Sequence, residues 1–171
     1  MGRLITFSHP QLLTHLIERI ARGVGNPKGF PVAIPQNRQV EDIQISTVGI
    51  CAGSGGSVLR SCASADLLFT GELSHHEALA ATELGKSVVT LFHSNTERGF
   101  LHSVLREQLS RTLKGEWKRV REEESARGKD LSPEWEDALK DEEVLVEVSE
   151  RDRDPYGIVI LQASEVEGKP L

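Results

Sequence analysis

Three short apolar segments follow one another in this chain, and each runs into a polar loop and then a helical pattern. They cover residues 48–51, 67–69 and 88–92. Strands that alternate with amphipathic helices are joined by right-handed crossovers into a parallel sheet, so the three loops should emerge along one edge. Open α/β sheets bind ligands at such an edge. The sequence therefore predicts an α/β fold, with a mixed, largely parallel sheet flanked by helices and a site at these loops.

The segments before this region predict one more helix and two more strands. Residues 2–7 alternate as a short strand, and Ser8 then caps a helix with Pro10 in its first turn. Residues 30–34 predict a strand that we place at an edge of the sheet, because Pro31 and the following Pro35 cannot donate to a ladder.

The segment 114–143 changes character, since 18 of its 30 residues are charged. We expect a charged helical insertion there, in which Trp117 and Trp135 allow the segment to fold back. Residues 144–148 and 158–161 then return to strand patterns. A length of 171 residues fits a single domain over residues 1–171.

The composition argues against some classes of binding partner and indicates a cellular compartment. The net charge of -6 argues against direct nucleic acid binding and against an anionic membrane as the main partner. No apolar run approaches the roughly 20 residues that cross a bilayer, and no signal peptide is recognisable, so we expect a cytoplasmic protein, with mitochondria or nucleus as alternatives. Cys51 and Cys62 have small or apolar neighbours and should be reduced core residues.

His93 and Glu97 are the first candidates for chemistry. They are four residues apart at the start of a helix, so both side chains can point the same way. An imidazole and a carboxylate presented together suit a divalent metal ion such as zinc, iron or manganese. The alternative is a capping box, in which Ser94 and Glu97 only satisfy backbone N–H groups.

His75 and His76 follow the second apolar segment, and Glu72 precedes them. Adjacent residues diverge by about 100 degrees on a helix, so the two histidines cannot both bind one ion. One histidine and Glu72 could each hydrogen-bond to a metal ligand without binding the metal themselves. The alternatives are that His75 is solvent-exposed while His76 hydrogen-bonds locally, and that Glu72 interacts with the helix dipole.

The first loop is rich in glycine and offers backbone N–H groups to an anion such as phosphate or a carboxylate. It is neither a Walker loop nor the dinucleotide fingerprint, and a turn made only for packing is the alternative. The loop also approaches the serine-hydrolase elbow, but Asp66 lies at the wrong end of its strand for that triad. The predicted anion-binding residues are Gly53, Ser54, Gly55, Gly56 and Ser57.

Taken in order, these motifs resemble the Nif-three-like family, the Ngg-one-interacting-factor-like proteins that are also described as type-two homologues of GTP cyclohydrolase I. The resemblance covers nearly all of residues 2–155 apart from the insertion. The motifs are Ala52-Gly53-Ser54-Gly55-Gly56-Ser57, Asp66-Leu67-Leu68-Phe69-Thr70-Gly71-Glu72 with His75-His76, His93-Ser94-Asn95-Thr96-Glu97-Arg98-Gly99, and the closing Val146-Glu147-Val148-Ser149-Glu150-x-Asp152-x-Asp154-Pro155.

The resemblance implies an α/β fold of two intertwined halves, toroidal hexamers and two metal ions in a cleft. It implies a histidine pair and an aspartate as metal ligands from the first half, and a histidine and a glutamate from the last. Only His93 and Glu97 match these positions. We therefore expect this chain to correspond to the C-terminal half of a longer member, as a fragment, a truncated product or a half-protein that borrows ligands from a partner.

Two functions follow as hypotheses. The first is a metal-dependent hydrolase of the family type, acting on a small substrate, in which this chain alone lacks half of the metal ligands. The second is a non-catalytic regulatory protein that binds other proteins, with the insertion as the first surface to test. In either case we expect a homo-oligomer, because a half-protein should expose apolar surface.

Overall fold

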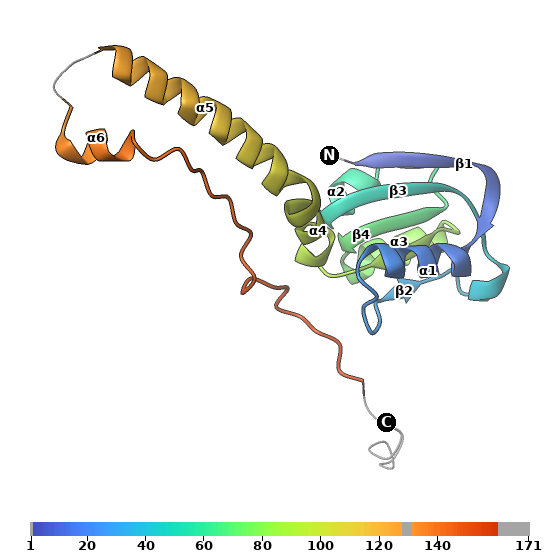
Figure 1. Ribbon diagram of the computed structural model, residues 1–171. Coiled ribbons are helices and arrows are strands. Elements are labelled where there is room, and N and C mark those ends of the chain that lie inside the picture. Colours follow the sequence, from blue (N-terminus) through green and yellow to red (C-terminus); the bar gives the residue numbers. More distant parts are fainter. Residues whose placement is uncertain (1, 128–130, 161–171) are drawn as a thin grey trace. The chain divides into compact units, whose positions relative to one another are not determined.

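A five-stranded mixed sheet forms the core of one of two units in the computed structural model, which describes residues 2–127 and 131–160 (Figure 1). Its strand order is β1-β3-β4-β5-β2, with β3, β4 and β5 parallel and the two edge strands antiparallel. The predicted α/β class and parallel core are confirmed. The strands are β1 (Arg3–Leu12), β2 (Val32–Ala33), β3 (Gln44–Ser54), β4 (Leu67–Glu72) and β5 (Ser87–Thr90).

Helices cover both faces of this sheet. Helix α1 packs on one face through Leu13 and Leu16, which lie against Ile45, Leu67 and Val89. The spacing of its apolar residues suits one helical face. The short helix α2 and helix α3 pack on the other face, in a second buried cluster. These helices are α1 (Leu13–Gly23), α2 (Gly56–Leu59) and α3 (His75–Glu83).

The predicted helix start at Ser8 is wrong, because β1 continues through Ser8 and Pro10 and α1 begins only at Leu13. Backbone pairing decides the difference: the register with β3 slips after Thr6 and resumes at Gln11. Strand pairing with a buried neighbour outweighs the local capping preference of one serine. The edge position predicted for residues 30–34 is confirmed by β2, which pairs only with β5.

The described parts of Met1–Glu97 and Arg153–Leu171 form the unit that holds the sheet, and Arg98–Asp152 forms a second, helical unit. The prediction of a single domain over residues 1–171 stays a prediction. The second unit consists of α4 (Arg98–Phe100), a π-helical turn (Leu101–Leu105), α5 (Arg106–Arg127) and α6 (Pro133–Ala138).

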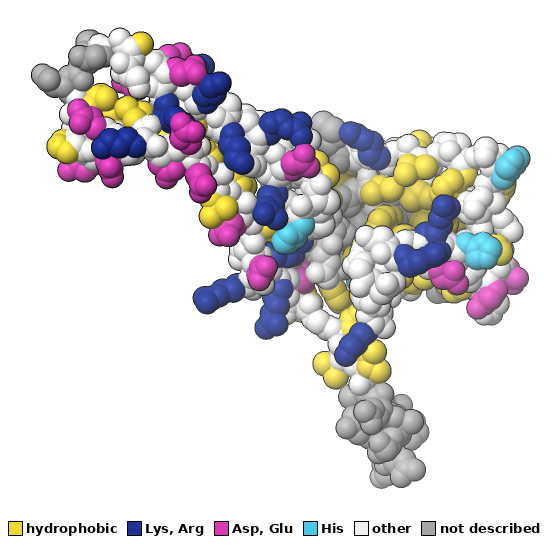
Figure 2. Space-filling model, viewed as in Figure 1, with side chains coloured by type: hydrophobic (Ala, Val, Ile, Leu, Met, Phe, Trp, Pro, Cys, Tyr) yellow, Lys and Arg dark blue, Asp and Glu magenta, His cyan; other side chains and the backbone are white. Residues whose placement is uncertain are grey.

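The second unit is a charged helical pair, as its composition predicts. Side chains of both signs are interspersed along it (Figure 2). Trp117 packs edge-on against Trp135, with 6.3 Å between ring centroids, and donates a hydrogen bond of 2.8 Å to the carbonyl of Asp141. The two tryptophans therefore join the long helix to the chain that returns after it.

The strands predicted at residues 144–148 and 158–161 do not form in the part of the chain that is described; Leu161 lies outside it. Val144, Val146 and Val148 are half-buried while the residues between them are exposed, so the alternation is present. A strand also needs a ladder partner, and Arg106 instead bonds the carbonyl of Val146. Alternation therefore predicted the exposure pattern but not the pairing.

Cys51 and Cys62 are free thiols, buried and half-buried, as expected. Of the helices in the described ranges, none is long and apolar enough to span a membrane.

Candidate metal centre

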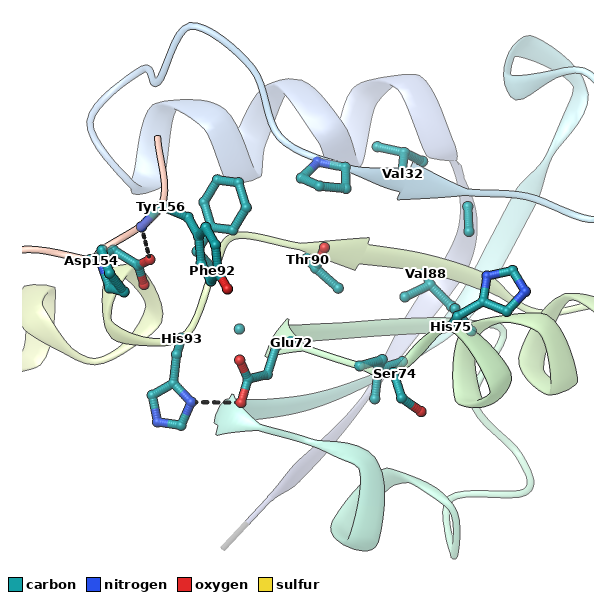
Figure 3. A pocket seen from close by; sticks show the side chains of 16 residues that line it. Val32, Glu72, Ser74, His75, Val88, Thr90, Phe92, His93, Asp154 and Tyr156 are labelled. Carbon is teal, nitrogen blue, oxygen red and sulfur yellow. Dashed lines mark hydrogen bonds and ion pairs between the residues drawn. The ribbon is translucent and has the colours of Figure 1, made fainter. Parts of the chain in front are cut away.

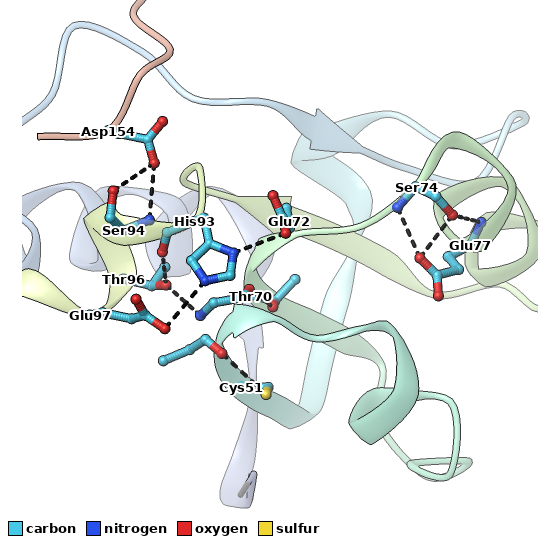
Figure 4. A network of polar contacts seen from close by, with 12 residues as sticks. Cys51, Thr70, Glu72, Ser74, Glu77, His93, Ser94, Thr96, Glu97 and Asp154 are labelled. Atoms are coloured by element: carbon cyan, nitrogen blue, oxygen red, sulfur yellow. Dashed lines mark hydrogen bonds and ion pairs between the residues drawn. The ribbon is translucent and has the colours of Figure 1, made fainter.

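Two threonines tie together the loops at the carboxyl ends of β3, β4 and β5 (Figure 4). The Thr70 hydroxyl donates to the carbonyl of Gly53 at 3.0 Å, and the N–H of Gly53 donates to the Thr96 hydroxyl at 2.8 Å. That hydroxyl in turn donates to the carbonyl of His93 at 2.8 Å. The three loops therefore meet at one edge, as the strand–loop–helix order predicts.

His93 stands between two carboxylates at this edge. Its Nδ1 lies 2.9 Å from Glu72 Oε1, and its Nε2 lies 3.5 Å from Glu97 Oε1. The hydrogen bond that His93 donates to Glu72, with a smaller Coulombic contribution from Glu97, raises the pKa of His93 above its usual value. In the neutral imidazole a proton on Nδ1 is held by Glu72, which leaves the Nε2 lone pair on the side of Glu97.

A carboxylate behind an imidazole is the usual support of a metal-binding histidine, because it fixes the tautomer and the ring orientation. The structure places Glu72 against His93, and its role as the support of a metal ligand stays a prediction. His93, Glu72 and Glu97 side chains are each about half exposed, so a ligand can reach them.

Gly53 makes room for this pair. A Cβ atom there would lie 2.6 Å from Glu97 Oε1 and 3.0 Å from His93 Nε2. Its φ of +66° lies in the left-handed region, which side chains other than glycine rarely adopt. Both the backbone conformation and the close approach therefore require glycine at this position.

The capping box suggested for Ser94 and Glu97 does not form. The N–H of Glu97 donates to the carbonyl of Ser94 and not to its hydroxyl. The hydroxyl and the N–H of Ser94 both donate to Asp154 Oδ2, each at 3.0 Å. The Glu97 carboxylate is therefore left to face His93.

Asp154 is a residue of this site whose role sequence reasoning missed. It is 7% exposed, and its Oδ1 accepts a hydrogen bond from the N–H of Tyr156. Burial acts to raise the pKa of Asp154, but the hydrogen bonds from Tyr156 and Ser94 outweigh it and hold that pKa below the usual value. Its place in the closing motif was a signal, but the pairing with Ser94 spans 60 residues and no local pattern predicts it.

His75 and His76 begin α3 and pack edge-on, with 5.5 Å between ring centroids. Both are exposed, and Figure 3 shows His75 at the far end of a pocket from His93. A capping box does form on this helix, between Ser74 and Glu77. The structure thus does not bring the histidine pair to His93, and its role in a site stays a prediction.

Some backbone N–H groups of the glycine-rich loop donate hydrogen bonds to other parts of the protein. The N–H of Gly53 bonds Thr96 and that of Gly55 bonds the carbonyl of Glu72. A Cβ on Gly56 would lie 2.0 Å from Glu77 Oε1, so a carboxylate already lies beside the loop. Anion binding by residues 53–57, including Ser54 and Ser57, stays a prediction.

Asp66 has a structural role that accounts for it without a catalytic triad. Its Oδ2 accepts hydrogen bonds from the N–H groups of Ser46 and Thr47 at 2.8 and 2.9 Å. This carboxylate therefore joins the starts of β3 and β4, at the edge opposite the site.

The donor set fits part of a metal site. Within residues 2–127 and 131–160, no group of three or more histidine, cysteine or acidic side chains is arranged to hold a metal ion. His93 Nε2 and Glu97 Oε1 supply two donors of the right chemistry, on side chains that are about half exposed. A complete site therefore needs further donors from elsewhere.

At the carboxyl ends of its parallel strands, the α/β sheet presents a histidine between two carboxylates. Proteins with this combination of fold and side chains form a class of candidate metalloproteins. Comparison with known proteins identifies the family within that class. The model of the Duf34/NIF3 (NGG1p interacting factor 3) family matches residues 1–125. This chain belongs to that family, as its motifs predicted.

The chain matches less than two fifths of the length of the relatives described next. It is 47% identical over 109 residues to the rat NIF3-like protein 1, covering 64% of this chain and 28% of the relative. It is 36% identical over 106 residues to the Saccharomyces cerevisiae NGG1-interacting factor 3, covering 61% and 37%. A Bacillus cereus protein related to NIF3 shares the fold at a TM-score of 0.59 and 20% identity, over 93% of this chain and 36% of that one.

Proposed function

We propose that this chain contributes His93 and Glu97 to a divalent metal site of the hydrolase type, with zinc, iron or manganese as the metal. The observation that carries the proposal is the pair of carboxylates around His93, at 2.9 Å from Nδ1 and 3.5 Å from Nε2. Glu72 holds the Nδ1 proton, so Nε2 and Glu97 are left as the two donors. A capping role for Glu97, which would have explained it without metal, is not observed.

Two donors are fewer than a catalytic metal site uses, since catalytic zinc has three protein ligands and a water. The remaining donors in this proposal come from a partner or from further parts of a longer chain. A metal bound there would supply an activated water for hydrolysis. The curated relatives are far longer than the matched region, so an activity of the whole protein is part of the proposal.

The metal proposal predicts the behaviour of a His93→Ala variant. Wild-type protein, purified together with the partner or the longer chain that supplies the remaining donors, should retain zinc, iron or manganese after dialysis, and the variant should retain at least about tenfold less, because the removed imidazole is a direct ligand. Inductively coupled plasma mass spectrometry measures both. His76→Ala is the control, since His76 is exposed on α3, and it should keep its metal. Equal metal in His93→Ala and wild type would refute the proposal.

The alternative function is binding of other proteins, which the name of the yeast relative suggests for that protein. The supporting observation is a row of exposed leucines at helical spacing: Leu105, Leu109 and Leu113 are 38–41% exposed on the second unit. Metal analysis separates the two functions, because a binding role alone leaves wild-type protein without retained metal.

Self-association is a further part of the proposal. Leu4 and Ile5 are 49% and 42% exposed on the edge strand β1, whose outer edge is unpaired in the described sheet. Exposed apolar side chains on an edge strand favour association with another strand. Size-exclusion chromatography with light scattering should give a mass of at least twice 18.8 kDa. A single sharp peak at the monomer mass would contradict this expectation.

A further inference from the structure

A pocket of about 500 Å³ opens beside the candidate metal centre (Figure 3). Its walls come from the edge strand β2, the end of β4, the start of α3 and the segment that follows β5. Glu72 and His93 belong both to the pocket and to the candidate centre. A molecule in the pocket would therefore lie next to the carboxylate-supported imidazole, at the sheet edge where α/β proteins bind ligands.

Two aromatic side chains form one wall of this pocket. Phe92 has a φ of +65°, a conformation that bulky residues rarely adopt. Its ring centroid lies 6.2 Å from that of Tyr156, with 35° between the ring planes. Tyr156 is 74% exposed, so its ring is not consumed by packing in the core. Apolar Val32 and Val88 also line the pocket, and this combination of aromatic and apolar side chains suits a flat aromatic ligand.

The charges on the pocket wall favour one kind of ligand over another. Glu72 and Asp154 are its acidic side chains, and none of its described lining residues is lysine or arginine. Glu72 uses Oε1 for His93, which leaves its other oxygen as an acceptor. His75 and His93 also line the pocket, and His93 is already paired with Glu72 through Nδ1. An anionic ligand would lie beside the carboxylates with no guanidinium or ammonium to offset the repulsion, whereas an N–H donor or a cation would find the free oxygen of Glu72 as an acceptor.

We propose that this pocket binds a planar aromatic group that is neutral or positively charged and carries N–H donors, stacked beside Tyr156 with its donors toward Glu72. Only the assignment of such a group to a substrate rests on the proposed metal-dependent function, because the pocket can bind the group without a metal. This differs from the phosphate-type ligand that the glycine-rich loop suggested.

Binding of small probes to metal-free protein tests this proposal. Benzamidine is planar, aromatic and cationic, benzoate has the same shape with a negative charge, and cyclohexanecarboxamidine keeps the charge without the aromatic ring. Titration calorimetry or ligand-observed NMR in the presence of a chelator should rank benzamidine at least about tenfold above benzoate, because the carboxylates repel an anion. Cyclohexanecarboxamidine should bind several-fold more weakly than benzamidine.

Tyr156 allows a matched pair of variants, since its exposure removes the risk of unfolding. Tyr156→Ala should weaken benzamidine binding about three- to tenfold, the range expected for one aromatic contact, and Tyr156→Phe should leave it unchanged. Val159→Ala is the control, because Val159 is 83% exposed and is not among the residues that line the pocket.

Benzoate that binds as tightly as benzamidine, or Tyr156→Ala that behaves like Val159→Ala, would overturn the proposal. Either result leaves the metal proposal intact, because the probes are measured without metal. Conversely, retained metal in His93→Ala would refute the metal centre while probe binding in the pocket still supports this inference.

Discussion

Gly53→Ala should abolish metal retention while leaving a folded protein. The added Cβ would meet Glu97 Oε1 at 2.6 Å and His93 Nε2 at 3.0 Å, so at least one of the two proposed ligands must move. We expect the metal affinity to fall by about 100-fold or more, at the upper end of the losses seen when even the supporting residues of metal sites are changed. Competition with a chelating dye measures this affinity.

The Gly85→Ala variant is the control that distinguishes the steric contact expected in Gly53→Ala from the cost of placing alanine at a positive φ. Gly85 also has a positive φ, +79°, where it ends α3, but a Cβ there would meet nothing within 4 Å. Both variants should lose about 1–2 kcal/mol of unfolding free energy through the left-handed conformation alone. Only Gly53→Ala should lose metal, and a similar loss in Gly85→Ala would show that the effect comes from general destabilisation.

The order of the strands along the chain was enough to predict the class of fold and the edge of the sheet at which the three loops meet. Buried strands such as β4 and β5 contain the short apolar runs 67–69 and 88–89, and their loops had to share one edge once the crossovers were right-handed. Thr70 and Thr96 then join those loops, although nothing in the local sequence of either residue indicates it. Periodicity over a few residues predicts individual helices and strands, whereas the hydrogen bonds between loops form only where the assembled sheet brings those loops together.

Capping is where sequence reasoning about this chain was least reliable. Ser74 and Glu77 form a capping box, while Ser94 and Glu97 have the same spacing and do not. The difference is Asp154, which arrives from a distant part of the chain and takes both donors of Ser94. The same spacing therefore gives two outcomes, because a buried carboxylate outcompetes the local acceptor. Ser8 failed as a cap for a related reason, since β1 continues through it in the sheet.

Gly71→Ala should cause the largest loss of stability among single substitutions at this edge. A Cβ on Gly71 would lie 2.7 Å from the carbonyl oxygen of Gly53 and 2.9 Å from those of Phe92 and His93. All three are backbone atoms of the neighbouring loops, so no side chain can rotate away. We expect a loss of about 3 kcal/mol in the free energy of unfolding, the upper part of the range for overpacked sites, measured by urea denaturation.

Gly23→Ala is the matched control, because a Cβ at the end of α1 would meet nothing within 4 Å. It should leave the unfolding free energy unchanged or slightly higher, since alanine restricts the unfolded chain. A loss below about 1 kcal/mol in Gly71→Ala would mean that the three loops are not packed backbone against backbone. The position of His93 relative to Glu72 and Glu97 depends on that packing, because Gly71 immediately precedes Glu72 and a Cβ added to it would meet the carbonyl of His93.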